Sequence, residues 1–312
     1  MSEQNKLHIS VSPHISNPRT TASIMLDVII ALLPTALAGI IIFGIRALAV
    51  IAVSIAAAVA SESIFCIIVK KENTVPDLSS VVTGFILALN LPVSIPLWQA
   101  AVGSVFAIIV VKCLFGGIGQ NFANPAMTAR IFMITAFAAT ASVAYPTIVD
   151  TTSVATPLVE LGYGLLPESF LGLFLGTVGG AIGEVSSLAI LIGFVYLLVR
   201  KVIRPFAPIS FVLTVFIFSL IFEGFDLTYA LAWTLSGGLL FGAVFMATDY
   251  STTPITDVGK IIFGVGAGFI TVVIRFFGSY PEGVSFGILF MNILTPYIDK
   301  LVVNKPFGGK IR

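Results

Sequence analysis

Long apolar runs separated by short polar breaks make up most of this chain. About twenty apolar residues cross a bilayer as an α-helix, and the runs lack the alternation of apolar and polar positions typical of barrel strands. We therefore predict an all-α polytopic membrane protein with about ten transmembrane helices. The predicted spans are residues 24–44, 47–69, 78–91, 97–115, 125–141, 185–200, 207–222, 229–247, 259–277 and 284–303.

The spans divide the chain into two similar halves and three polar segments. The third and fifth spans are short, and residues 165–181 form a further apolar, Gly-rich piece that we expect to insert only partway. The predicted parts are an N-terminal tail at 1–23, a five-span half at 24–141, a loop at 142–184, a second five-span half at 185–303 and a tail at 304–312.

Composition supports a membrane protein. Hydrophobic residues make up 57% of the 312 residues and charged residues only 10%, against about 25% charged in an average globular chain. The mean hydropathy is +1.08. A soluble fold has too little interior for so much apolar surface. The net charge of +1 does not suggest a nucleic-acid partner, and none is predicted.

The basic residues predict an orientation. Cytoplasmic loops carry an excess of Lys and Arg. If the N-terminus is cytoplasmic, only Arg46 and Arg275 of the 16 basic residues fall on the outer side. Both termini are therefore predicted in the cytoplasm and the 142–184 loop on the extracytoplasmic side. The predicted location is the inner (cytoplasmic) membrane, in contact with its lipid.

Two spacings suggest a duplicated frame. Gly84 and Pro96 are twelve residues apart, as are Gly242 and Pro254, and each pair straddles a polar break. Five spans in each half is an odd number, so a repeat would be inverted. The breaks at 90–96 and 248–254 would then face each other near the midplane. Ordinary Gly and Pro breaks between helices explain the spacings equally well.

Residues for conventional catalysis are few. The only histidines, His8 and His14, lie in the N-terminal tail, so no histidine-based triad or zinc site is expected within the spans. Cys66 and Cys113 are too few to hold an iron–sulfur cluster alone. We interpret them as buried apolar side chains, with a cluster shared at a subunit interface as the alternative. No catalytic or metal-binding residue is assigned.

Three acidic residues in or beside the spans are candidates for an ion path. Asp27, Glu62 and Asp249 would each be costly in hydrocarbon, and such residues usually line a path or have a partner. A structural role, in which each ties helices together or meets a neighbouring subunit, is at least as well supported for each one singly.

One loop is unusually rich in hydroxyl groups. Residues 150–156 hold four of them and one carboxylate, within a segment, 142–184, that has no Lys or Arg. Taken alone, this stretch is consistent with a simple capping loop.

Four longer motifs occur in order along the chain. They are GGIGQNFANPAMTARIF at 116–132, VDTTSVATPL at 149–158, FGAVFMATDYSTTPITDVGKIIFG at 241–264 and RFFGSYPEGVSFGILFMNILTPYID at 275–299. Together they resemble the D subunit of the Rnf electron-transport complex and, more distantly, the B subunit of the sodium-pumping NADH:quinone reductase. The resemblance covers essentially the whole chain.

The resemblance implies a covalent flavin. Members of this family carry FMN joined through its phosphate to a threonine hydroxyl, in a pattern like Asp-x-x-(Ser/Thr)-Gly-Ala-Thr. The matching residues here are Asp150, Ser153, Ala155 and Thr156, which makes Thr156 the expected attachment residue. Val154 stands where the pattern has Gly, and a β-branched side chain cannot take a positive φ cheaply.

The resemblance also implies a role. The chain would relay electrons within a complex that couples ferredoxin and NAD to Na⁺ or H⁺ transport, with catalysis by the complex as a whole. Its expected partners are the other Rnf subunits and a flavin transferase, and a second, non-covalent flavin is a further expectation. The competing hypothesis is a stand-alone inverted-repeat secondary transporter or channel without a redox role.

Overall fold

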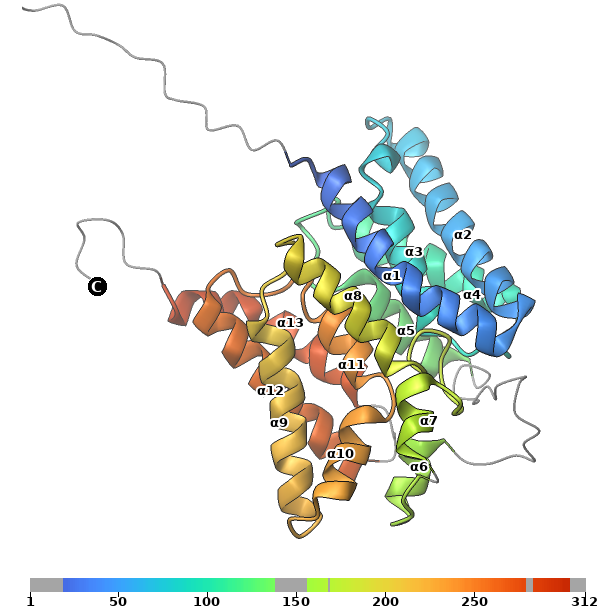
Figure 1. Cartoon of the computed structure of the whole chain (residues 1–312). Helices are drawn as coiled ribbons and strands as arrows, with labels where there is room; N and C mark the ends of the chain where they lie inside the picture. Colours follow the sequence, from blue (N-terminus) through green and yellow to red (C-terminus); the bar gives the residue numbers. More distant parts are fainter. Residues whose placement is uncertain (1–18, 138–155, 168, 279–282, 304–312) are drawn as a thin grey trace, which may run out of the picture.

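The computed structural model describes residues 19–137, 156–167, 169–278 and 283–303, and these residues form helices and loops without a β-strand (Figure 1). The first half contains α1 (Thr21–Phe43), α2 (Ile45–Val69), the short 3-10 helix η1 (Val75–Asp77), α3 (Ser79–Leu89), α4 (Leu97–Val105), the π-helix η2 (Phe106–Cys113) and α5 (Pro125–Ala136). The connecting segment contains α6 (Pro157–Gly162) and α7 (Phe170–Leu175). The second half contains α8 (Ser187–Val199), α9 (Phe206–Phe222), α10 (Leu227–Leu235), α11 (Leu239–Phe241), the π-helix η4 (Gly242–Met246), α12 (Asp257–Phe277) and α13 (Val284–Leu301).

The helices confirm the all-α class of a polytopic membrane protein. In the described residues α1, α2 and α12 are long and apolar enough to cross a membrane, and α10 with α11–η4 forms a fourth candidate bent by 61°. Four shorter apolar stretches are α3, α4–η2, α8 and α9. Every predicted span coincides with a helix or a broken helix, whereas the count of ten and the division into five-span halves stay predictions.

Local signals explain where the helices begin, end and break. The Thr20 side chain caps α1 by accepting a hydrogen bond from Ser23 N, and Gly44 ends it at a positive φ of 77°. The predicted continuous span at 229–247 is wrong in one respect, because it breaks between α10 and α11. The break falls on Ser236, Gly237 and Gly238, where Gly237 has a φ of 70°.

The two halves share an order of packing. In the first, α2 packs on α3 and α4; in the second, α9 packs on α10 and α12. The first helices of the halves, α1 and α8, pack on each other. Gly264 and Gly268 let α12 approach the backbone of α9, with Ala207 O and Phe211 O beside them. This order of contacts is what a duplicated frame predicts.

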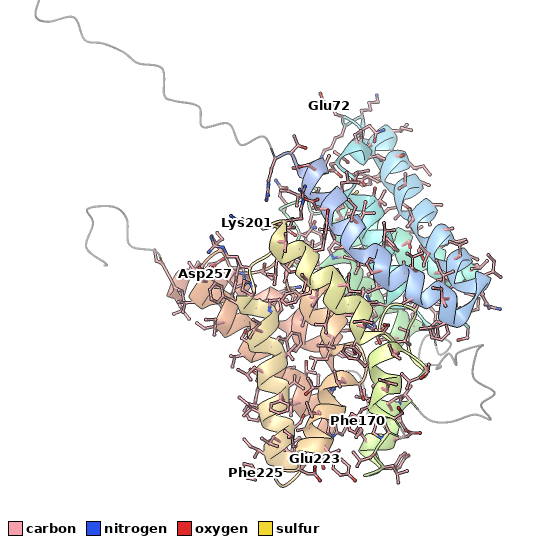
Figure 2. All side chains as sticks on the ribbon, in the orientation of Figure 1. Glu72, Phe170, Lys201, Glu223, Phe225 and Asp257 are labelled. Carbon is pink, nitrogen blue, oxygen red and sulfur yellow. The ribbon has the colours of Figure 1, made fainter. Side chains whose placement is uncertain are left out.

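Charged groups gather at two ends of the molecule. Arg19 Nη2 donates to Arg200 O at 2.7 Å, and Arg204 pairs with Asp257 at 2.5 Å. The start of α1, the α8–α9 loop and the start of α12 therefore meet at what we call the basic end. Figure 2 shows Lys201 and Asp257 there, and Phe170, Glu223 and Phe225 at the other end.

The far end of α9 is acidic. The N–H groups of Thr228 and its neighbour lower the pKa of the exposed Asp226 carboxyl, which caps α10 and carries negative charge at neutral pH. The last turn of α13 lies at the basic end, because Asp299 Oδ1 accepts from Ile255 N at 3.0 Å. The segregation of charge agrees with the predicted orientation, and the membrane side of each end stays a prediction.

The two breaks begin beside each other and then extend apart. Asn90 Nδ2 lies 3.7 Å from Met246 Sδ, so the ends of α3 and η4 do meet. Beyond them, Arg46 Nε donates to Val93 O at 2.9 Å, whereas the Tyr250 hydroxyl contacts Val202 O. Arg46 follows α1 and Val202 lies near its start, so the breaks extend toward opposite ends of the molecule.

Candidate functional site

Of the four residues in the predicted attachment motif, the structure describes Thr156. It is the N-cap of α6, where Oγ1 accepts a hydrogen bond from Val159 N at 3.3 Å, and its side chain is half-buried. Pro157 occupies the first helical position, as is common at helix starts. Asp150, Ser153 and Ala155, together with Val154, lie outside the described residues.

The helix that begins at Thr156 is anchored to the second half. Leu158 and Leu161 are buried against Ala232 and Trp233 of α10. The Tyr229 hydroxyl donates to Gly164 O at 2.9 Å just beyond α6. Burial of leucine side chains contributes roughly 1.5–3 kcal/mol each. Thr156 is thus held beside α10 at the acidic end.

Aromatic rings and an arginine stiffen this anchor. The Trp233 ring lies 4.8 Å from that of Phe276, and the Phe276 ring lies 5.0 Å from that of Phe222. Trp233 Nε1 donates to Glu223 Oε1 at 2.8 Å. Arg275 Nη1 donates to Trp233 O at 2.7 Å, which links α12 to the same place. The platform beneath α6 therefore draws on α9, α10 and α12.

The first candidate of the ion path, Asp27, has a cationic partner. Arg200 Nη2 lies 3.1 Å from its carboxylate and the Tyr196 hydroxyl donates to it at 3.0 Å. Both partners belong to α8 or its C-cap, so this pair ties α1 to α8 near the basic end. These contacts agree with the structural alternative, in which Asp27 ties helices together instead of lining an ion path.

The second candidate, Glu62, forms a fully buried ion pair. Lys112 Nζ lies 2.7 Å from Glu62 Oε1, and the two side chains are only 3% and 1% exposed. The Thr74 hydroxyl donates to the same oxygen at 2.6 Å, and Ser79 Oγ contacts the ammonium. The pair joins α2 to the π-helix η2 and to the start of α3.

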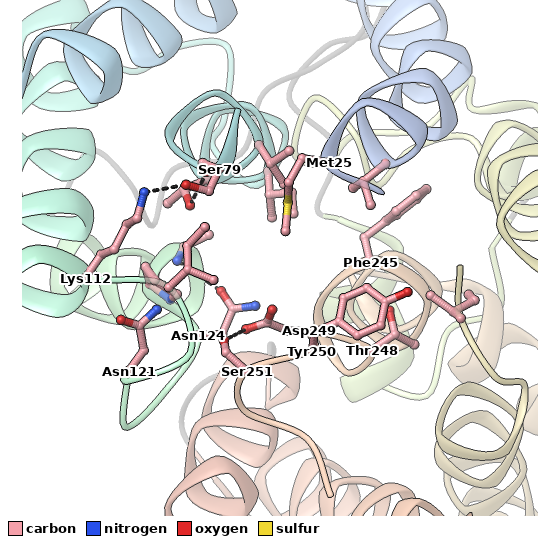
Figure 3. Close-up of a pocket in the computed structure, with 18 of the residues that line it drawn as sticks. Met25, Ser79, Lys112, Asn121, Asn124, Phe245, Thr248, Asp249, Tyr250 and Ser251 are labelled. Carbon is pink, nitrogen blue, oxygen red and sulfur yellow. Dashed lines mark hydrogen bonds between the residues drawn. The ribbon is translucent and has the colours of Figure 1, made fainter. Parts of the chain in front are cut away.

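The third candidate, Asp249, lines an open cavity at the basic end. Its carboxylate accepts from Ser251 Oγ at 2.9 Å and Thr252 Oγ1 at 3.0 Å, and no cationic side chain of the described residues pairs with it. Lys112 lines the same cavity, as Figure 3 shows. The cavity thus brings together Asp249 and the cationic partner of Glu62, while Asp27 is not among its lining residues.

Sequence reasoning missed one central ion pair. We assigned Glu184 to the outer loop and Arg130 to the inner basic residues, but Arg130 Nη1 lies 2.6 Å from Glu184 Oε1 with both side chains buried. Asn90 Oδ1 contacts the same guanidinium. Lys112 was likewise counted as an inner charge and is buried.

The segment before Glu184 explains this burial. Ile182 N donates to Leu91 O at 3.1 Å and Gly183 N to Leu89 O at 2.7 Å. Residues 181–186 therefore re-enter the core and satisfy carbonyls that the end of α3 leaves free. The small residues Ala181 and Gly183 were the available signal for such close approach.

The two cysteines are buried and free, as the interpretation of buried apolar side chains expects. Within the part of the chain that the structure describes, no group of three or more His, Cys, Asp or Glu side chains could hold a metal ion.

Comparison with known proteins identifies the family. The family model described as "NQR2, RnfD, RnfE family" matches residues 8–308. The chain is 46% identical to the D subunit of the Na⁺-translocating ferredoxin:NAD⁺ oxidoreductase complex of Acetobacterium woodii, covering 99% of this chain and 97% of the relative. It is 39% identical to the D subunit of the proton-translocating ferredoxin:NAD⁺ oxidoreductase complex of Clostridium ljungdahlii, covering 99% and 98%. These matches confirm the resemblance stated from the four motifs, and the chain belongs to the NQR2, RnfD, RnfE family.

Proposed function

We propose that this chain is the membrane-embedded D subunit of an Rnf-type complex and that it carries FMN in phosphoester linkage on Thr156. The match over residues 8–308 supports the first part. The half-buried hydroxyl of Thr156, at the start of an anchored helix, supports the second. The loop that holds it is proposed to face the extracytoplasmic side of the cytoplasmic membrane, where a flavin transferase would act.

The residues described here would position the group and not react themselves. Thr156 supplies the ester oxygen, and α6 fixes that oxygen against α10 through Leu158 and Leu161. Bound FMN would supply one-electron chemistry, and the protein sets its distance from the next redox centre. The aromatic platform of Trp233 and Phe276 holds α6, and with it the attachment point, in place.

The assembly is proposed from the relatives. They are named as subunits of complexes that couple ferredoxin and NAD⁺ to Na⁺ or proton translocation. We propose that this chain relays electrons in the same reaction together with the other Rnf subunits. A second, non-covalent flavin belongs to the proposal; acid extraction of the purified complex followed by chromatography would release it as a flavin additional to the covalent one.

The attachment is tested by replacing one hydroxyl. The chain is produced with its flavin transferase, denatured and examined by in-gel flavin fluorescence and by the mass of the peptide that contains residue 156. We expect the parent chain to fluoresce and to carry FMN minus water on Thr156, and Thr156→Ala to lose both signals.

Thr151→Ala, which removes a neighbouring hydroxyl of the same loop, is the matched control and should retain fluorescence. Fluorescence that persists in Thr156→Ala would place the flavin elsewhere. Absence of any adduct in the parent chain would favour the stand-alone transporter or channel.

A further inference from the structure

Three cationic residues meet where α8 ends, and we call them the cation cluster: Arg19, Arg200 and Lys201. Arg19, just before α1, donates from Nη2 to Arg200 O at 2.7 Å and from Nη1 to Lys201 O at 3.3 Å. Its guanidinium therefore lies over the last turn of α8. All three residues are exposed, and Figure 2 shows Lys201 at this end. Arg200 also pairs with Asp27 at 3.1 Å, but the Asp27 side chain is only 9% exposed. The cluster thus presents positive charge at the surface.

Lys201 has a backbone conformation that favours glycine. Its φ is 54°, and Val202 N donates to Leu197 O at 2.9 Å, which is the closing hydrogen bond of a helix end where glycine is usual. A side chain at positive φ carries a conformational cost. A cation also suits the carboxyl end of a helix, and Lys70 at the end of α2 has a similar φ of 56°. Lys70 is therefore a matched reference for Lys201 outside the cation cluster.

Exposed apolar side chains run along α1 and α8 from this cluster. They recur at spacings of three and four residues, which places them in one stripe on each helix. The stripe of α8 starts directly before Arg200, and that of α1 starts about two turns after Arg19. The side chains are between 38% and 74% exposed, and they are Leu26, Ile30 and Leu33 on α1 and Ile192, Val195 and Val199 on α8.

The two stripes lie on the same side of the α1–α8 pair. The helices meet through Asp27 and Ala31 of α1 and Gly193 and Tyr196 of α8: the Tyr196 hydroxyl donates to Asp27, and a Cβ at Gly193 would contact Ala31 O. At about 100° per residue, each stripe is turned by roughly 100° from this contact, in the same rotational sense. The helices are antiparallel, because the end of α8 meets the start of α1 (Figure 1). Equal turns in an antiparallel pair point to one side, so the stripes form one apolar face that begins at the cation cluster.

A cation cluster at the end of an apolar face suits an anionic phospholipid. We propose that Arg19, Arg200 and Lys201 bind the headgroup phosphate of such a lipid and that its acyl chains lie along the two stripes. Basic residues at a membrane surface attract anionic headgroups, and Arg and Lys both bind phosphate. An acidic protein segment would match the cations but not the apolar face that continues along the helices. The inference goes beyond the redox role and does not require the flavin.

Photo-crosslinking tests the lipid directly. The purified full-length chain is placed in phosphatidylcholine nanodiscs that contain a trace of phosphatidylglycerol or of phosphatidylcholine with a photoactivatable acyl chain. Labelled peptides are quantified by mass spectrometry. We expect the phosphatidylglycerol probe to label the peptides of the two stripes several-fold more than the phosphatidylcholine probe does. Equal labelling by the two probes would overturn the proposal.

Lys201→Gly separates headgroup binding from the structure of the helix end. Glycine suits the left-handed backbone, so the melting temperature in phosphatidylcholine should be unchanged or higher. One basic residue near the surface contributes about fivefold to the binding of anionic lipid, so labelling of the stripes by the phosphatidylglycerol probe should fall about fivefold. Lys70→Gly makes the same change at the end of α2 and should leave this labelling unchanged. No fall in Lys201→Gly, or an equal fall in both variants, would show that the cation cluster does not hold the headgroup.

Two further measurements identify the occupant. Inorganic phosphate added at constant ionic strength should not reduce labelling by the phosphatidylglycerol probe, because the acyl chains contribute to binding. A loss of labelling would assign the cluster to free phosphate. The purified complex should give the same labelled peptides as the isolated chain. Labelling that disappears in the complex would assign this face to a neighbouring subunit and overturn the lipid site.

Discussion

At the scale of single residues, the buried charges stand out because removing a charge from water costs more free energy than burying any other kind of side chain. Glu62 with Lys112 and Glu184 with Arg130 are ion pairs nearly closed to solvent, whereas Arg204 with Asp257 is 60% and 40% exposed. Removing one partner of a buried pair leaves an uncompensated charge, and removing one partner of an exposed pair leaves a solvated one. The two kinds should respond very differently to substitution.

Arg130→Met tests this difference at the centre of the molecule. Because Glu184 loses its cation inside the core, we expect destabilisation of roughly 3–5 kcal/mol, seen as a large fall in the melting temperature of the purified protein in one detergent. Arg204→Met, the exposed counterpart, should cost about 0–1 kcal/mol. The double variant Arg130→Met with Glu184→Leu should recover part of the loss, and a double variant as unstable as the two losses added would argue against a direct pair.

At the scale of helices, much was predictable and some was not. Span positions follow from run length, so every predicted span meets a helix. The break at 236–238 was missed because Ser and Gly are too mildly polar to interrupt an apolar run. The attachment motif was placed only by its resemblance to the family's pattern and stays a prediction, and only Thr156 of it lies in the described residues. The burial of Glu184 was missed because its partner is 54 residues away, and such pairings are set by tertiary packing.

Glycine spacing governs how closely α9 and α12 approach. A Cβ at Gly268 would lie 2.7 Å from Thr214 Cβ and 3.0 Å from Phe211 O. Gly268→Ala should therefore push the helices apart and cost about 1–3 kcal/mol, measured as a lower melting temperature. Gly162→Ala, where a Cβ would meet nothing within 4 Å, is the matched control. Equal melting temperatures for the two variants would contradict the close approach.

At the scale of the whole molecule, charge is sorted between two ends. The basic end holds Arg19, Arg200 and Arg204, and the acidic end holds Glu223 and Asp226 beside α6. Since Lys and Arg are retained in the cytoplasm, the basic end should face inward. The proposed attachment residue at the start of α6 would then lie on the outer side, at the opposite end from the open cavity.

Reporter fusions test this orientation. An alkaline phosphatase fused near residue 160 should be active and one fused near residue 203 inactive, while a cytoplasmic fluorescent reporter should give the opposite pair of signals. The two positions lie on either side of α8, so each reporter should be active at one position and inactive at the other within one experiment. Reversed signals at both positions would invert the assignment and separate Thr156 from an extracytoplasmic transferase.

The wide turn of η2 has a consequence for helix phase. A π-helical segment contains an additional residue compared with an α-helix of the same rise, and Phe106–Cys113 lies directly upstream of the Gly-rich loop. Deleting one residue near Ala107 would let the segment relax to ordinary α-helix, and the later side chains would keep their angular positions around the axis. The same deletion in the regular helix α4 would rotate every later side chain by about 100°, which would swing Lys112 off the face that meets Glu62. The bulge therefore absorbs one residue just before this lysine, and a one-residue deletion should disturb the Lys112–Glu62 pair less within the bulge than in α4.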